Sequence, residues 1–122
     1  MSLKNLTVKQ AELEEKAIEQ IVAPYMKYAE DTGKILINAD LRKLGYEEQI
    51  GHYLIAKLGW KYLGNTELAK GAGNEEIEKV LGINGNTVRV NIKKLRDGGY
   101  LTTGTDKLHS PTIQLAYKFL ES

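Results

Sequence analysis

The segment Leu81–Leu101, LGINGNTVRVNIKKLRDGGYL, constrains the fold of this chain more than any other stretch. Gly82 is expected to end one helix, and Asn84 to cap a second helix that runs from about residue 85 to residue 97. Apolar residues spaced by four and three give this second helix one buried face, made of Val88, Ile92 and Leu95. A Gly-Gly pair at 98–99 then stops it. The segment therefore predicts a tight turn, a charged amphipathic helix and the start of a strand.

The flanking residues extend this order in both directions. Residues 74–81 predict a short helix with Asn74 as its N-cap, and Ile83 is expected to plug the space between the two helices. Residues 100–103 predict a strand, residues 104–111 a polar loop, and residues 112–115 the returning strand. Short helix, turn, helix and hairpin is the order of a winged helix-turn-helix. The expected fold class is thus mainly α with a small β-hairpin wing.

The first part of the chain predicts an added amphipathic helix. It starts near residue 8, after a Thr7 cap, and its apolar pattern continues to Ala29, with a kink at Pro24 or a split near residue 22. Residues 35–37 suggest a short strand, and residues 46–63 a central, mostly buried helix. We therefore divide the chain into a helical extension over residues 1–33, a possible dimerisation element, and a winged helix-turn-helix domain over residues 34–122.

The composition argues against several classes of protein. The 122 residues include no cysteine, which excludes disulfides and thiolate metal sites, and the two histidines, His52 and His109, lack the spacing of metal ligands. No nucleophile–base arrangement is evident, so we expect neither a catalytic site, nor a metal, nor a cofactor. The N-terminus does not resemble a signal peptide, and no apolar run is long enough to span a membrane. A cytoplasmic, non-membrane protein is expected.

The charge is distributed unevenly along the chain. The net charge is only +1, which does not by itself indicate a nucleic-acid-binding protein. Residues 1–33 carry four basic and six acidic side chains, whereas residues 84–109 carry five basic and two acidic ones, a net of +3. A local basic patch of this kind can attract phosphates.

The segment around the second helix resembles a known superfamily. It is similar to the DNA-binding heads of winged helix-turn-helix regulators, especially the GntR-like and MarR-like groups, over about residues 74–115. The matching positions are Gly82, Asn84, Asn86, Thr87, Val88, Arg89, Leu95, Gly98 and Tyr100. The resemblance implies a fold that binds double-stranded DNA and regulates transcription. It covers neither the first 64 residues nor any effector domain.

A helical wheel assigns the candidate contacts. Side chains opposite or beside the buried face near the start of the helix are expected to reach base edges: Asn86, Thr87, Arg89 and Val90. Basic residues further along are expected to bind phosphates: Lys93, Lys94 and Arg96. The polar loop over residues 104–111 would be the wing, with Lys107 and His109 as contacts.

Two questions stay open at the level of sequence. The stripe Leu13/Ala17/Ile21 favours a homodimer, since paired modules match pseudo-palindromic DNA sites, but the same helix could fold back onto its own domain. The exposed Val90 and the small net charge are also compatible with a winged helix that binds another protein within a larger assembly. The sequence does not identify an effector ligand or a DNA target.

Overall fold

The computed structural model describes residues 10–121, with side chains from Glu14 onward. These residues form α1 (Gln10–Val22), α2 (Tyr46–Gly59), α3 (Asn74–Leu81), α4 (Gly85–Asp97) and α5 (Ile113–Leu120). Two antiparallel hairpins pair β1 (Met26–Ala29) with β2 (Lys34–Ile37), and β3 (Leu101–Thr103) with β4 (His109–Pro111). Short 3₁₀ turns lie at Leu41–Lys43, Trp60–Leu63 and Leu68–Lys70. The expected mainly helical class with a small hairpin is confirmed at this level.

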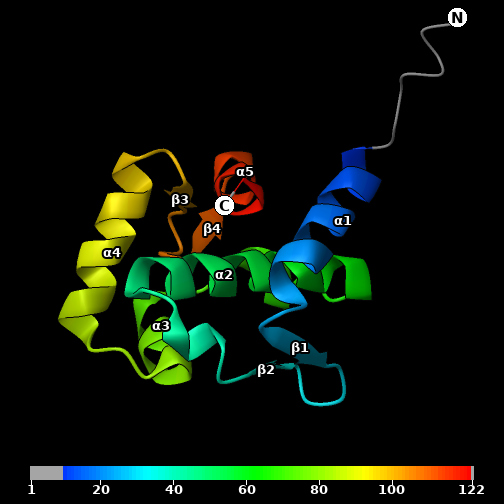
Figure 1. Cartoon of the computed structure of the whole chain (residues 1–122), viewed down its shortest axis with the longest axis horizontal. Coiled ribbons are helices and arrows are strands. Elements are labelled where there is room, and N and C mark those ends of the chain that lie inside the picture. Colours follow the sequence, from blue (N-terminus) through cyan, green and yellow to red (C-terminus); the bar gives the residue numbers. More distant parts are fainter. Residues whose placement is uncertain (1–9, 122) are drawn as a thin grey trace, which may run out of the picture.

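Helix α2 lies at the centre of the molecule. Every residue from Gln49 to Lys57 is buried, so the helix is covered around its whole circumference, as its broad apolar pattern predicted. Helices α1 and α4 pack against opposite ends of α2, and α5 lies across it between them (Figure 1). The predicted helix over residues 46–63 is confirmed, with its last turn wound as a 3₁₀ helix.

The hydrophobic core takes residues from both sides of the predicted boundary at residue 33. Ile18, Ile21 and Val22 of α1 are buried in the same cluster as α2, α3 and α4. Of the stripe expected to form a dimer contact, Ile21 therefore faces its own domain and Ala17 is half-buried, while the Leu13 side chain lies outside the described part. Helix α1 thus contributes to the fold of the domain itself.

The expected continuation of the first helix to Ala29 is wrong. Helix α1 ends at Val22, and the chain turns at Pro24 and enters β1. Proline has no N–H for an intrahelical bond and clashes with the preceding turn, so the split, one of the two predicted outcomes, prevails. Tyr25 and Ala29 matched a helical spacing, but Met26 and Tyr28 face the core by strand alternation, paired with Ile37 and Ile35. The predicted strand over residues 35–37 is confirmed as β2.

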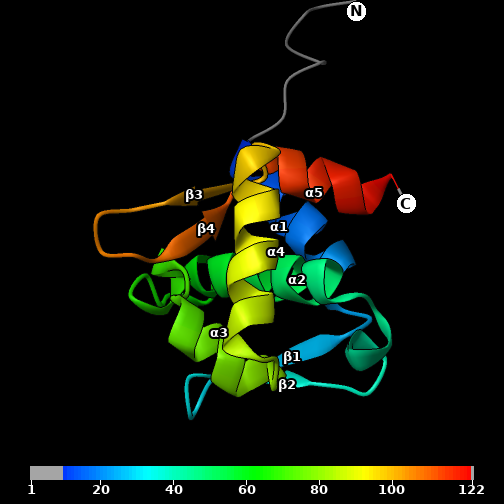
Figure 2. The same ribbon diagram turned by 90° about the vertical axis from the view of Figure 1, so that its left-hand side faces the viewer.

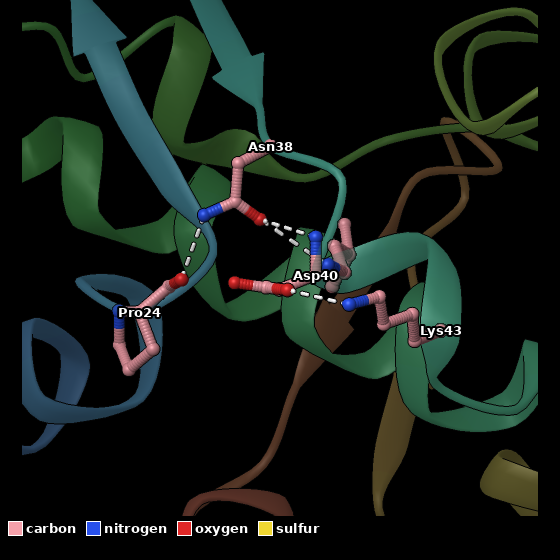
Figure 3. Close-up of polar contacts among 5 residues, drawn as sticks. Pro24, Asn38, Asp40 and Lys43 are labelled. Atoms are coloured by element: carbon pink, nitrogen blue, oxygen red, sulfur yellow. Dashed lines mark hydrogen bonds and ion pairs between the residues drawn. The ribbon is translucent and has the colours of Figure 1, made fainter.

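The polar side chain of Asn38 fixes the exit of this first hairpin (Figure 3). Its Nδ2 donates to the carbonyl oxygen of Pro24 at 2.7 Å, and its Oδ1 accepts from the N–H groups of Asp40 and Leu41 at 3.0 and 3.2 Å. The Lys43 ammonium pairs with Asp40 at 3.3 Å. This arrangement starts the 3₁₀ turn that inserts the fully buried Leu41 into the core.

The expected return strand over residues 112–115 is also wrong. The partner of β3 is β4, which ends at Pro111, because proline cannot donate to a further ladder bond. Thr112 then turns the chain into α5, with its N–H on the carbonyl of Tyr100 and its hydroxyl on that of Gly99. Ile113 and Leu115 fit strand alternation over three residues, but Leu115 and Phe119 at helical spacing pack inward. None of the helices within residues 10–121 combines the length and apolarity needed to cross a membrane.

Candidate nucleic-acid interface

Local sequence signals place α4. Gly82 follows α3 with a φ of 66°, a left-handed conformation that glycine adopts without strain, and Ile83 is buried between the helices. The Oδ1 of Asn84 accepts the N–H of Asn86 at 2.8 Å and so caps α4. Val88, Ile92 and Leu95 are buried against the core. The predicted turn, cap and buried face are all confirmed.

The outward face of α4 gathers four of the seven contact residues that were predicted on this helix. Asn86, Arg89, Val90 and Lys93 are all exposed, and the Val90 side chain is 54% exposed although it is apolar. Figure 2 shows α4 running along the front of the molecule, with no other helix or strand in front of it and the β3–β4 hairpin projecting to one side. The Arg89 guanidinium donates to Oδ1 of Asn86, so these two side chains already lie together.

The side chains on the flanks of α4 are more enclosed by neighbouring groups than those on its outward face. Thr87 is half-buried, and its carbonyl accepts from Nδ2 of Asn91 at 2.8 Å. Lys94 is exposed but borders a groove of about 650 Å³ that also contains Glu47 and Glu48 at the start of α2. Lys94 therefore shares this groove with two acidic side chains of another helix, which a wheel of α4 alone cannot show.

A chain of hydrogen bonds joins the end of α4 to the hairpin and to α3. The Arg96 guanidinium approaches Oγ1 of Thr103 at 3.4 Å, and that hydroxyl lies 2.8 Å from Nδ1 of His109. The opposite ring nitrogen of His109, Nε2, lies 2.7 Å from Oδ1 of Asn74. Since an amide oxygen only accepts, Nε2 carries the proton and Nδ1 accepts from Thr103.

These hydrogen bonds change two predictions that were made from the sequence. His109 lies in the hairpin as expected, but its side chain is only 5% exposed, because it faces α3 and α4. Burial, and secondarily the charge of Arg96, lower the pKa of His109 below its ordinary value, which favours the neutral ring. Asn74 is the first residue of α3 and not its cap; Gly73 takes that place, since the Asn74 amide is engaged with His109.

The base of the hairpin is also tied to the chain before α3. Ala72 and His109 exchange backbone hydrogen bonds of 3.2 and 2.9 Å. Gly71 precedes this bridge with a φ of 120°, and a Cβ there would stand 2.3 Å from the carbonyl oxygen of His109. At the far end, Lys107 adopts a φ of 65° and is exposed at the tip. The tip lysine is thus exposed, and its predicted contact with DNA stays a prediction.

The electrostatic character of the face is basic but not uniformly so. Within residues 14–121, no carboxylate pairs with Arg89, Lys93, Lys94 or Lys107 at ion-pair distance. The face also includes a negative charge, since the Glu78 carboxylate of α3 lies over the first residue of α4. A Cβ on Gly85 would stand 2.6 Å from Oε1 of Glu78. Glu78 favours the helix dipole there but opposes a phosphate at that spot. The basic side chains of α4 therefore begin at Arg89, beyond the first turn that Glu78 approaches.

Comparisons of the chain with protein-family models, with curated proteins and with solved structures found no match.

Proposed function

We propose that this chain binds double-stranded DNA through a winged helix-turn-helix formed by α2, α3, α4 and the β3–β4 hairpin, and that it acts as a transcriptional regulator. The observation that carries the proposal is the outward face of α4, where Asn86, Arg89, Val90 and Lys93 stand exposed together. An α-helix fits the major groove of B-DNA, with the residues of its first turns at the base edges. At this end of α4, Glu78 lies over Gly85, but Asn86 and Arg89 remain exposed.

The residue types on this face suit base recognition. Arg89 can grip a guanine with two hydrogen bonds, Asn86 can do the same for an adenine, and Val90 can contact a thymine methyl group. In the free protein Arg89 and Asn86 bind each other, so the bases would replace that contact. Thr87 is half-buried on the flank, and we assign to it a contact with a base or the adjacent phosphate.

The remaining basic residues suit phosphates, which position the protein without specifying sequence. Lys93 continues the outward face, Lys94 and Arg96 lie on its flanks, and Lys107 stands at the tip of the hairpin, the proposed wing. The bridge between Ala72 and His109 supports this arrangement, because it ties the base of the hairpin to the segment just before α3. His109 keeps the wing in place from inside and is not among the proposed DNA contacts.

A homodimer would give the protein two such faces. The exposed apolar side of α5 favours this assembly: Ile113 is 53% and Tyr117 51% exposed. With Leu120 and the α1 residue Ala17 they border a cleft of about 540 Å³ between α5 and α1. Exposed apolar patches of this kind mark contacts with other proteins. We place the dimer contact on α5 and the adjoining side of α1.

A second candidate function is a winged helix that binds another protein. The exposed Val90 and the net charge of +1 favour it, since an exposed apolar side chain suits a protein surface and DNA binding usually comes with a larger positive charge. Selection from a random pool of duplexes separates the two functions. DNA recognition predicts an enriched sequence whose binding weakens steeply with salt. The absence of any enriched sequence, with only weak binding that is the same for every duplex, would favour the protein-binding module.

A further inference from the structure

A cleft of about 400 Å³ lies between the first hairpin, α2 and α3, away from the outward face of α4. Its apolar walls are formed by Ile35, Trp60, Leu68 and Val80, and its polar groups include Lys57 and Glu76. This volume falls in the range of small-molecule sites, which are mostly apolar with a few convergent polar groups. The cleft is therefore large enough for a small organic ligand.

The Lys57 ammonium is the most unusual group in this cleft. Its side chain is only 8% exposed, and its Nζ lies 3.2 Å from Oε2 of Glu76. The same oxygen accepts the hydroxyl of Tyr53 at 2.7 Å. An ammonium has three N–H donors, and the described residues supply one acceptor, which it shares. A buried cation with unfilled donors gains from a further acceptor, especially an anionic one.

The surrounding groups leave the cleft positive. Lys34 and Lys79 also border it, so three lysines line it against the single carboxylate of Glu76. Lys79 pairs with Glu75 at 3.4 Å, but both side chains are largely exposed, and solvent screens such a pair. Burial, and then the hydrogen bond to Glu76, raise the pKa of Tyr53 well above its ordinary value, so its hydroxyl remains a donor. The charge balance disfavours a cationic ligand.

We propose that this cleft binds a small organic acid, whose carboxylate lies at Lys57 and whose apolar body lies against Trp60, Val80 and Leu68. Such binding does not require α4 to contact DNA. The cleft is nevertheless well placed to influence it, because Val80 lies in the last turn of α3, directly before the Gly82 turn into α4. Arg42 also binds this end of α3, through a hydrogen bond to the carbonyl of Leu81.

The protein contains one tryptophan, so the indole N–H signal of Trp60 reports on the cleft directly in a proton–nitrogen correlation spectrum. The probes are 4-fluorobenzoate and its neutral isostere 4-fluorobenzamide, titrated into the full chain. We expect 4-fluorobenzoate to shift the Trp60 signal saturably, with a Kd of about 1 mM or tighter, and 4-fluorobenzamide to bind at least about tenfold more weakly. No saturable shift, or equal affinity for the two probes, would overturn the proposal.

Two variants test the assignment of Lys57. Lys57→Met should abolish the preference for the acid, whereas the control Lys27→Met, on the exposed side of β1, should leave it unchanged. Val80→Phe keeps the ammonium and fills the cleft, and should weaken both probes. If Lys57→Met fails to fold, Val80→Phe decides the matter: unchanged binding of 4-fluorobenzoate to it would place the probe elsewhere and refute the site.

Discussion

Helices α4 and α5 each bury one side in the same core, but their exposed sides differ in chemical character. The outward side of α4 carries Asn86, Arg89 and Lys93, whereas that of α5 carries Ile113 and Tyr117. A polar, basic face tolerates water when unoccupied and attracts a polyanion, while an apolar one gains free energy by leaving water. The difference fits our proposal that the two helices serve different partners, DNA for α4 and a second copy of the chain for α5.

The largest expected effect is on assembly. Replacing Ile113 and Leu120 together by Glu should raise the dimer dissociation constant by about 100-fold or more, since an unpaired carboxylate would be buried at the contact. Light scattering at tens of micromolar should report a dimer for the unaltered chain and for the control Tyr117→Phe, and a monomer for the double variant. A monomeric unaltered chain would remove the role given to α5.

The base of the β3–β4 hairpin, beside α4, depends on the backbone at Gly71. Gly71→Ala should destabilise the fold by about 2 kcal/mol or more, because its φ of 120° disfavours a side chain and the new Cβ would collide with the His109 carbonyl. The control is Gly45→Ala, where φ is −62° and a Cβ meets nothing within 4 Å. Urea denaturation measures both. Equal stability of the two variants would mean that the backbone joint at Gly71 is not needed.

A smaller effect concerns the dependence of stability on pH, to which one buried histidine near each helix contributes. His109 lies in the hairpin beside α4 and bonds to Asn74, and His52 stacks on Phe119 of α5 with ring centroids 4.1 Å apart. Burial lowers the pKa of both histidines, and at His52 the carbonyl and charge of Glu48 oppose the shift in part. The unfolded chain therefore takes up protons first, near its unperturbed pKa of about 6.5, and stability should fall as the pH drops below that value.

Urea denaturation between pH 8 and pH 5.5 measures this dependence. His52→Asn preserves a donor near Nδ1, and each variant removes one titrating ring. His109→Gln preserves the donor near Nε2 but loses the acceptor that Nδ1 offers to Thr103, so the slope of its stability with pH, and not its stability at one pH, is compared. Each should flatten the curve in part, and the double variant more fully. A free energy of unfolding that does not change for the unaltered chain over this range would contradict the assignment of neutral, buried rings.

The sequence predicted α4 well because its signals are local. The left-handed Gly82, the Asn84 cap and the spacing of Val88 and Ile92 act within one or two turns, so a short window contains them. The prediction for the segment that contains β1 was wrong, because Tyr25 and Ala29 match a helical spacing. Pro24, one position before Tyr25, prevents the helix from continuing. Short segments that fit two periods are decided by their tertiary contacts.

The part of the site that sequence missed depends on distance along the chain. His109 contacts Asn74, 35 positions away, and nothing in either local sequence indicates that a hairpin will carry one to the other. The same holds for α5, whose first residues read as a strand until Leu115 and Phe119 are seen to pack against α2. The exposed residues of α4 were predictable, since exposure followed from the buried face opposite them.

The central claim is that the outward face of α4 reads DNA, and titration of a selected duplex against the unaltered chain, Arg89→Ala and Lys93→Ala at two or more salt concentrations tests it most directly. Arg89→Ala should lose about 1–3 kcal/mol on the selected site and far less on a scrambled duplex. Lys93→Ala should weaken binding to both duplexes and reduce the salt slope by about one unit. Lys27→Ala, on β1, should change neither. Specific affinity that survives Arg89→Ala unchanged would contradict the account.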